Sequence, residues 1–272
     1  MTRDRPIATE YSRGVDALNR ADFPAAVEIF DGIVSEDPDH GAAWAKLGVC
    51  YLELREIDRA LEALNQAIRA NPADADNYYL KGNAEGSAGR MDEAKACYRQ
   101  ALLVDPGHTK AEEFLMRTES LLESREHLRR AVRLLALEER TGEELNSCLR
   151  ELVQSVAIFP NSPARNYLSQ CAKEIRSRTE TREIEVPSEF CTPHWRELVE
   201  RGYQQIQFQN WTGARQIYEE ALEIYSNAAF VHHALGFAFL EDDEPENAVS
   251  AWMRVQELDP EYDFRFFGRI KK

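Results

Sequence analysis

The chain has 272 residues, of which 43% are hydrophobic and 30% are charged, and its formal net charge is −15. This much apolar material can form a core, which excludes a wholly disordered chain. No third of the chain is net basic, which argues against nucleic acid or an anionic membrane surface as the main partner. The acidity suits a soluble monomer, a salt-adapted host or a basic partner, and composition does not separate these three.

Cysteine usage and the longest apolar run favour a cytoplasmic protein. The five cysteines are scattered and form no C-x-x-C pair, which is typical of reduced thiols. The polar N-terminus leads into no apolar run, so no secretory signal is expected. The stretch 228–240 is too short to span a bilayer and is expected to be a buried helix.

The first third of the chain contains a pattern that recurs about every 34 residues. Apolar residues three or four apart predict two amphipathic helices in each unit. Small residues such as Gly48 and Ala60 fall where two helices must approach closely, and larger ones such as Leu64 fill the space beside them. The three occurrences are Gly14, Ala17, Ala26, Phe30, Ile33 and Pro38; Trp44, Leu47, Gly48, Tyr51, Ala60, Leu64, Ala67 and Pro72; and Tyr78, Gly82, Ala94, Tyr98, Ala101 and Pro106.

Polar and proline residues predict where the second helix of each unit begins and ends. Asp58 and Asp92 stand where N-caps are expected. Pro24 occupies a first turn, where its missing N–H costs little. The pair Asn71-Pro72 ends its helix, because the residue before a proline is pushed out of the right-handed helical region.

The middle of the chain departs from the period. Residues 111–122, 128–139, 143–159 and 163–178 are still predicted to be helical, and one degenerate repeat can be drawn through 129–162. Residues 179–193 lack helical periodicity and contain two prolines, so 179–194 is predicted to be a linker.

The pattern returns near the C-terminus in two further units, 195–228 and 229–262. It appears there as Gly202, Ala214, Tyr218 and Ala221, and then as His232, Leu235, Gly236, Phe239, Ala248, Trp252, Val255 and Pro260. Residues 263–272 mix aromatic and basic side chains. We expect this tail to fold back over the last helix as a cap, since solenoid ends expose an apolar face; the alternative is contact with a membrane or an acidic partner.

These residues resemble the tetratricopeptide repeat family. The resemblance implies an all-α, right-handed solenoid of antiparallel helix pairs, and it is specific for fold but weakly specific for function. The predicted organisation is a three-repeat module over 7–108, a divergent helical bridge over 109–178, the linker 179–194, a two-repeat module over 195–262 and the cap 263–272.

No pattern of catalytic or metal-binding residues is visible. Gly82, Gly86 and Gly89 match no phosphate-binding loop. Cys191 and His194 form a lone C-x-x-H, too few ligands for a closed zinc site. No nucleophile has a base at a recognisable spacing. The sequence therefore predicts no enzyme, no metal and no cofactor, and an unrecognised enzymatic site in 109–194 is the alternative.

The resemblance also implies a binding surface, because the first helix of each pair lines the concave wall of such arrays. This makes the predicted function that of a non-catalytic scaffold or adaptor that holds a peptide or helix of a partner protein. Asn83 could clamp a peptide bond, since its amide is both donor and acceptor. The alternative is self-assembly into a homodimer through the groove or the tail. The predicted groove residues are Tyr11, Val15, Leu18, Val49, Leu52, Asp76, Tyr79 and Asn83 in the N-terminal module, and Tyr203, Phe230, His233 and Phe237 in the C-terminal module.

One subfamily is disfavoured as a model. Tetratricopeptide domains that hold chaperone C-termini use a clamp rich in lysine and asparagine. The corresponding places here hold one lysine and no arginine, and Asp76 would repel a ligand carboxylate. Chaperone C-terminal tails are therefore unexpected partners. Those places are Tyr11, Val15, Lys46, Asp76 and Leu80.

Overall fold

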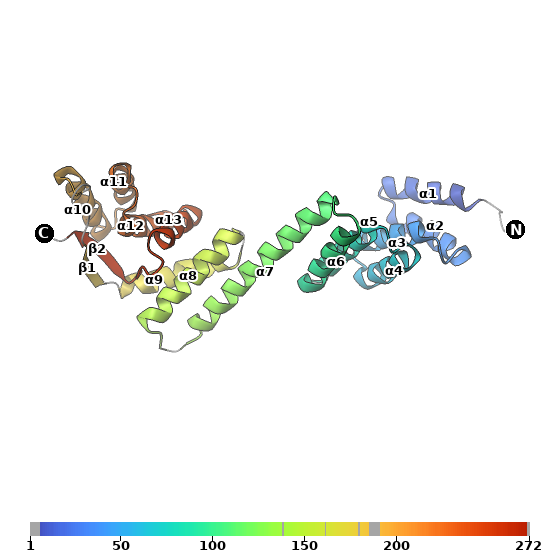
Figure 1. Ribbon diagram of the computed structural model, residues 1–272, viewed down its shortest axis with the longest axis horizontal. Coiled ribbons are helices and arrows are strands. Elements are labelled where there is room, and N and C mark those ends of the chain that lie inside the picture. Colours follow the sequence, from blue (N-terminus) through green and yellow to red (C-terminus); the bar gives the residue numbers. More distant parts are fainter. Residues whose placement is uncertain (1–5, 138, 161, 179, 185–190, 271–272) are drawn as a thin grey trace. The chain divides into compact units, whose positions relative to one another are not determined.

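The computed structural model describes residues 6–137, 139–160, 162–178, 180–184 and 191–270 (Figure 1). Its helices pack as successive antiparallel pairs, so the predicted all-α solenoid is confirmed. The chain divides into two compact units, unit 1 over residues 1–119 and unit 2 over residues 120–272.

Unit 1 consists of three helix pairs that coincide with the three predicted repeats. Helices α1, α3 and α5 are the first members of the pairs and contact one another in succession, while each also packs against its own partner. The pairs are α1 (Ile7–Asn19) with α2 (Phe23–Glu36), α3 (Gly41–Glu53) with α4 (Ile57–Ala70), and α5 (Ala75–Ser87) with α6 (Met91–Val104).

Close approach within each pair depends on a glycine facing a large side chain. A Cβ added to Gly14 would lie 2.7 Å from the ring of Phe30, which is itself fully buried. Gly48 faces Leu64 in the same way in the second pair. The recurring glycine thus lets two helix backbones come together around one large residue.

The predicted N-caps Asp58 and Asp92 are wrong by two positions. The cap positions of α4 and α6 are Glu56 and Arg90, and the two aspartates lie inside the first turn. The aspartates still favour the helix start, because negative charge suits the positive end of the helix dipole.

Helix α7 (Thr109–Leu135) is continuous across the division between the two units. The sequence predicted two helices here, 111–122 and 128–139. Residues 123–127 contain neither glycine nor proline, so nothing in the sequence ends the helix between them.

Unit 2 contains the rest of α7 and the remaining elements. The elements after α7 are α8 (Gly142–Ile158), α9 (Ala164–Ser177), β1 (Glu180–Ile184), α10 (Pro193–Gln207), α11 (Trp211–Ile224), α12 (Ala229–Glu241), α13 (Pro245–Leu258) and β2 (Phe266–Ile270). The pairs α10–α11 and α12–α13 coincide with the two predicted C-terminal repeats. The region predicted as a linker differs from expectation, since β1 occupies part of it and α10 begins within it; residues 179 and 185–190 lie outside the described residues.

The order of packing in unit 2 does not follow the order of the chain. Helix α8, which precedes the C-terminal repeats in sequence, packs against α13, the last repeat helix, and α9 packs on α8. Gln154 on α8 donates to the side-chain oxygen of Gln256 on α13 at 2.8 Å. The open side of α13 is therefore covered by α8, whereas the sequence predicted that the tail would cover it.

The tail reaches α13 only with Phe264, and its strand lies elsewhere. Strand β2 pairs in parallel with β1, in a register that runs from Glu180 opposite Phe266 to Ile184 opposite Ile270 (Figure 1). The pair contacts α12 and α10 through β2. Residues 262–270, hereafter the tail, thus lie against the first helices of the C-terminal repeats, the side that the sequence predicted to be an open groove.

Candidate partner-binding surface

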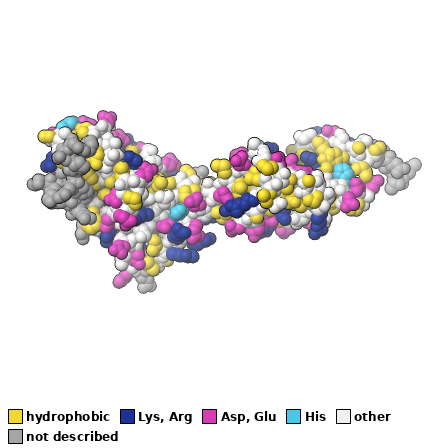
Figure 2. All heavy atoms as spheres, in the orientation of Figure 1, with side chains coloured by type: hydrophobic (Ala, Val, Ile, Leu, Met, Phe, Trp, Pro, Cys, Tyr) yellow, Lys and Arg dark blue, Asp and Glu magenta, His cyan; other side chains and the backbone are white. Residues whose placement is uncertain are grey.

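The predicted groove residues of the N-terminal module lie on α1, α3 and α5, and we call this set the N-terminal inner face. Its members are Tyr11, Val15, Leu18, Val49, Leu52, Asp76, Tyr79 and Asn83. All are partly or largely exposed, and none is fully buried. Figure 2 shows hydrophobic side chains reaching the surface over the helices of unit 1.

Tyr11 is held in place by two rings from neighbouring elements. It meets Phe30 edge-on at 5.7 Å between ring centroids and stacks on His40 at 5.4 Å. His40 is fixed in turn, because its Nδ1 accepts the N–H of Ala43 and so caps α3. Partial burial raises the pKa of the Tyr11 phenol, which remains a neutral hydrogen-bonding group.

Tyr79 has the corresponding environment in the third repeat. Its ring lies 5.3 Å from His108, which caps α7 by accepting the N–H of Ala111. Phe114, from the first turns of α7, meets Tyr79 edge-on at 5.5 Å. The bridge region therefore supports one side of Tyr79 without burying it completely.

Asn83 has one of its two polar atoms already engaged. Its Oδ1 accepts a hydrogen bond of 2.9 Å from the hydroxyl of Tyr98. Burial raises the pKa of that phenol to about 12, so Tyr98 stays protonated and donates. This bond orients the Asn83 amide, and its Nδ2 group is the atom that could donate to the carbonyl of a bound chain.

The remaining members give the surface its apolar and acidic character. Val15, Leu18 and Leu52 pack on the buried core of the first two repeats while keeping part of their surface exposed. Asp76 is 75% exposed and lies 3.1 Å from Nε2 of His108. The surface therefore combines half-buried apolar side chains with a few oriented polar groups.

The C-terminal residues predicted to line a groove are placed differently. Phe230, His233 and Phe237 are 5%, 0% and 1% exposed, and only Tyr203 keeps part of its surface. The tail covers this side of α12, with Tyr262 and Phe264 each 5.2 Å from the His233 ring. The expectation of an open groove here is wrong for this conformation, because the chain's own tail fills it.

Sequence reasoning missed the polar residues of α8 that hold the tail. Asn146 bonds both Asp263 and the backbone of Phe264, and Arg150 donates to the carbonyl oxygen of Tyr262 at 2.6 Å. Their partners lie more than a hundred residues away in sequence. No local pattern could have paired them, because the packing of α8 on α13 brings them together.

The described residues offer little for chemistry of other kinds. Among them no group of three or more His, Cys, Asp or Glu side chains is placed to hold a metal ion. All five cysteines are free thiols, and burial raises the pKa of Cys50 to about 11. Within the same part of the chain, every helix is too short or too polar to cross a bilayer.

Two family models match the N-terminal repeats. Both are described as tetratricopeptide repeat, and they cover residues 17–84 and 75–108. Residues 17–108 of the chain are tetratricopeptide repeats. The resemblance that the spacing indicated is thus confirmed, and the matched residues lie within unit 1.

The curated relatives of this chain are similar to it over short regions. A general transcriptional corepressor, ssn6, of Schizosaccharomyces pombe is 34% identical over 35% of this chain and 9% of its own length. Heat shock protein STI1 of Saccharomyces cerevisiae is 32% identical over 40% of this chain and 19% of its own length. The chain therefore spans less than a fifth of either relative.

One similar solved structure is the first tetratricopeptide domain of Spaghetti (RPAP3), bound to the HSP90 peptide SRMEEVD. It is 19% identical to this chain, with a TM-score of 0.42, over 43% of this chain and 92% of that one.

Proposed function

We propose that the protein is a non-catalytic adaptor whose N-terminal inner face binds an extended or helical segment of a partner protein. The observation that carries the proposal is the partial exposure of Val49, Leu52 and Tyr79 on the inner helices, together with the oriented amide of Asn83. Apolar surface flanked by a few fixed polar groups is typical of peptide sites. The five free thiols suit a reducing compartment such as the cytoplasm.

The relatives support a protein as the partner class but not a particular partner. By name one relative is a transcriptional corepressor and another is a heat shock protein. Each of them matches this chain over only a small part of the relative's own length. The same repeat thus occurs in proteins with different named roles, as expected of a fold that serves to bind other proteins.

The test is capture of partners from native lysate by variants of the intact protein. Asn83→Asp keeps the oxygen that accepts from Tyr98 and removes the amide donor, while Val49→Lys with Leu52→Lys places charge on the apolar part of the inner face. We expect each variant to lose the specific partners at unchanged helicity, measured by circular dichroism. Leu103→Lys, at a residue that is 76% exposed on α6, is the matched control and should capture normally. Equal capture by all variants would contradict the proposal.

A chaperone C-terminal peptide should not bind to the N-terminal inner face. The exposed carboxylate of Asp76 would repel a terminal carboxylate, and Tyr11 and Val15 offer it no positive charge. Labelled SRMEEVD should give no saturable change in fluorescence anisotropy with the wild-type protein. Saturable binding of this peptide to the wild-type protein would contradict the expectation.

A further inference from the structure

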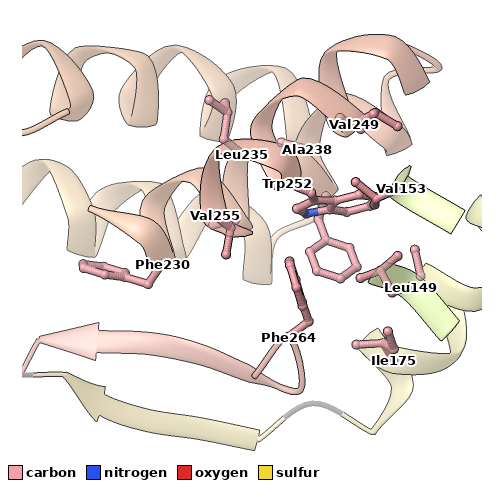
Figure 3. Packing of buried hydrophobic residues seen from close by; sticks show 14 of the residues in the cluster. Leu149, Val153, Ile175, Phe230, Leu235, Ala238, Val249, Trp252, Val255 and Phe264 are labelled. Atoms are coloured by element: carbon pink, nitrogen blue, oxygen red, sulfur yellow. The ribbon is translucent and has the colours of Figure 1, made fainter. Parts of the chain in front are cut away.

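The tail is anchored in unit 2 by one aromatic side chain. Phe264 is completely buried and points among side chains of four helices, including Leu149 of α8, Ile175 of α9 and Trp252 of α13 (Figure 3). Its ring also lies 5.2 Å from His233 of α12. These helices contact one another through their own side chains, so the tail adds to an assembly of helices that is already connected.

The backbone of the tail is held by side chains of α8 and also by a turn of its own, in which the N–H of Phe266 donates to the carbonyl oxygen of Asp263 at 3.2 Å. Asn146 donates from Nδ2 to Oδ1 of Asp263 at 2.7 Å, and its Oδ1 accepts the N–H of Phe264 at 2.8 Å. An amide side chain can bind a carboxylate and the next peptide N–H at the same time, which is a way of recognising a peptide. Asn146 thus holds the tail through both its amide donor and its amide acceptor.

Beyond Phe264 the tail continues as an added strand. Residues 266–270 pair in parallel with β1, which follows α9 in the chain. Strand addition to an available edge supplies main-chain hydrogen bonds that depend little on sequence. Side-chain specificity would therefore come from the segment around Asp263 and Phe264.

We propose that unit 2 contains a second peptide-binding site, occupied in cis by the chain's own tail. Its ligand class is a segment in which an aromatic residue directly follows an acidic one and the chain then runs on as a strand. The aromatic ring fills the pocket between α8, α9, α12 and α13. Asn146 binds the side chain of the acidic residue and the N–H of the residue that follows it. Arg150 binds the carbonyl oxygen of the residue that precedes the acidic one. The site is distinct from the N-terminal inner face and stands without it.

The experiment asks whether the tail binds as an exchangeable ligand or is a fixed part of the core of unit 2. A site-specific protease sequence is inserted between Pro260 and Glu261 of the full chain, the folded protein is cleaved, and a fluorescent peptide of the sequence 261–272 is added. We expect saturable uptake of the peptide by anisotropy as it exchanges with the cleaved tail. The Phe264→Ala peptide should bind about 30-fold more weakly or worse, as expected for loss of a central anchor.

A peptide with Glu261→Gln is the matched control, because Glu261 is exposed and should not alter affinity. Asn146→Asp in the protein should weaken the wild-type peptide, since it replaces the donor to Asp263 with a second carboxylate. Failure of the cleaved protein to take up peptide would overturn the proposal, whether the tail never exchanges or unit 2 unfolds on cleavage. Equal affinity of the wild-type and Phe264→Ala peptides would overturn it as well.

Discussion

Five residues in the turns between paired helices share a left-handed backbone conformation. Ala21, Arg55, Gly89, Gln209 and Asp243 have φ between 56° and 78°, and only one of them is glycine. A residue with a Cβ is strained there by roughly 1–2 kcal/mol. Ala21→Gly should therefore stabilise unit 1 by up to about 1 kcal/mol, whereas Gly89→Ala should destabilise it by a similar amount. Urea unfolding of the two variants checks this, and shifts of the same sign would contradict it.

His233 makes the stability of unit 2 depend on pH. Burial lowers the pKa of this imidazole to about 3, and the nearby Asp263 only partly opposes the shift. An unfolded histidine takes up a proton below about pH 6.5, whereas the folded one does not until about pH 3. The free energy of unfolding should therefore fall as pH drops through this window, by up to about 1.4 kcal/mol for each pH unit.

The variant His233→Gln isolates this effect, because glutamine can still bond the Tyr262 hydroxyl that lies 3.1 Å from Nδ1 of His233. Between about pH 6.5 and pH 4.5, which lies above the range in which an ordinary aspartate titrates, the stability of this variant should change less than that of the wild type. His232, whose pKa is also lowered by burial, is present in both proteins and cancels. Parallel stability curves for the two proteins would show that His233 does not carry the effect.

At the scale of elements, the contact of the tail with the helices of unit 2 should contribute to the stability of that unit. Phe264→Ala deletes a fully buried ring and should cost about 3–5 kcal/mol. Hydrogen exchange should speed up in α8 and α12, which hold the tail, and remain unchanged in α1–α6, whose core is separate. Faster exchange spread evenly over the whole chain would contradict this assignment.

The sequence predicted the ten repeat helices because their information is local. Gly14 with Phe30 and Gly48 with Leu64 recur at a fixed spacing, and each pair folds around its own contact. The same logic failed for the tail and for α8. Their contacts, such as Asn146 with Phe264, join distant segments and depend on α8 packing out of chain order. The residues of the N-terminal inner face could be predicted from the repeat pattern. The covering of the corresponding C-terminal surface by the tail could not.

At the scale of the molecule, the two units have separate hydrophobic cores. Leu47 is fully buried in the core of the first repeats, and Leu152 is fully buried in the core of unit 2. Leu47→Ala and Leu152→Ala should each cost about 2–5 kcal/mol. Hydrogen exchange by mass spectrometry should localise the first loss to α1–α4 and the second to α8–α13. Loss of protection in both units from either substitution would show that they unfold as one.

The adaptor role is tested most directly by asking which surface touches a partner in the cell. A photoreactive amino acid is placed at Val49, on the N-terminal inner face, and in a second protein at Leu103, which is exposed on α6 of the same unit. Irradiation of cells that express each protein should give discrete crosslinked partners from position 49, reduced by Asn83→Asp, and none of these from position 103. The same partners from both positions, or none from position 49, would contradict the account.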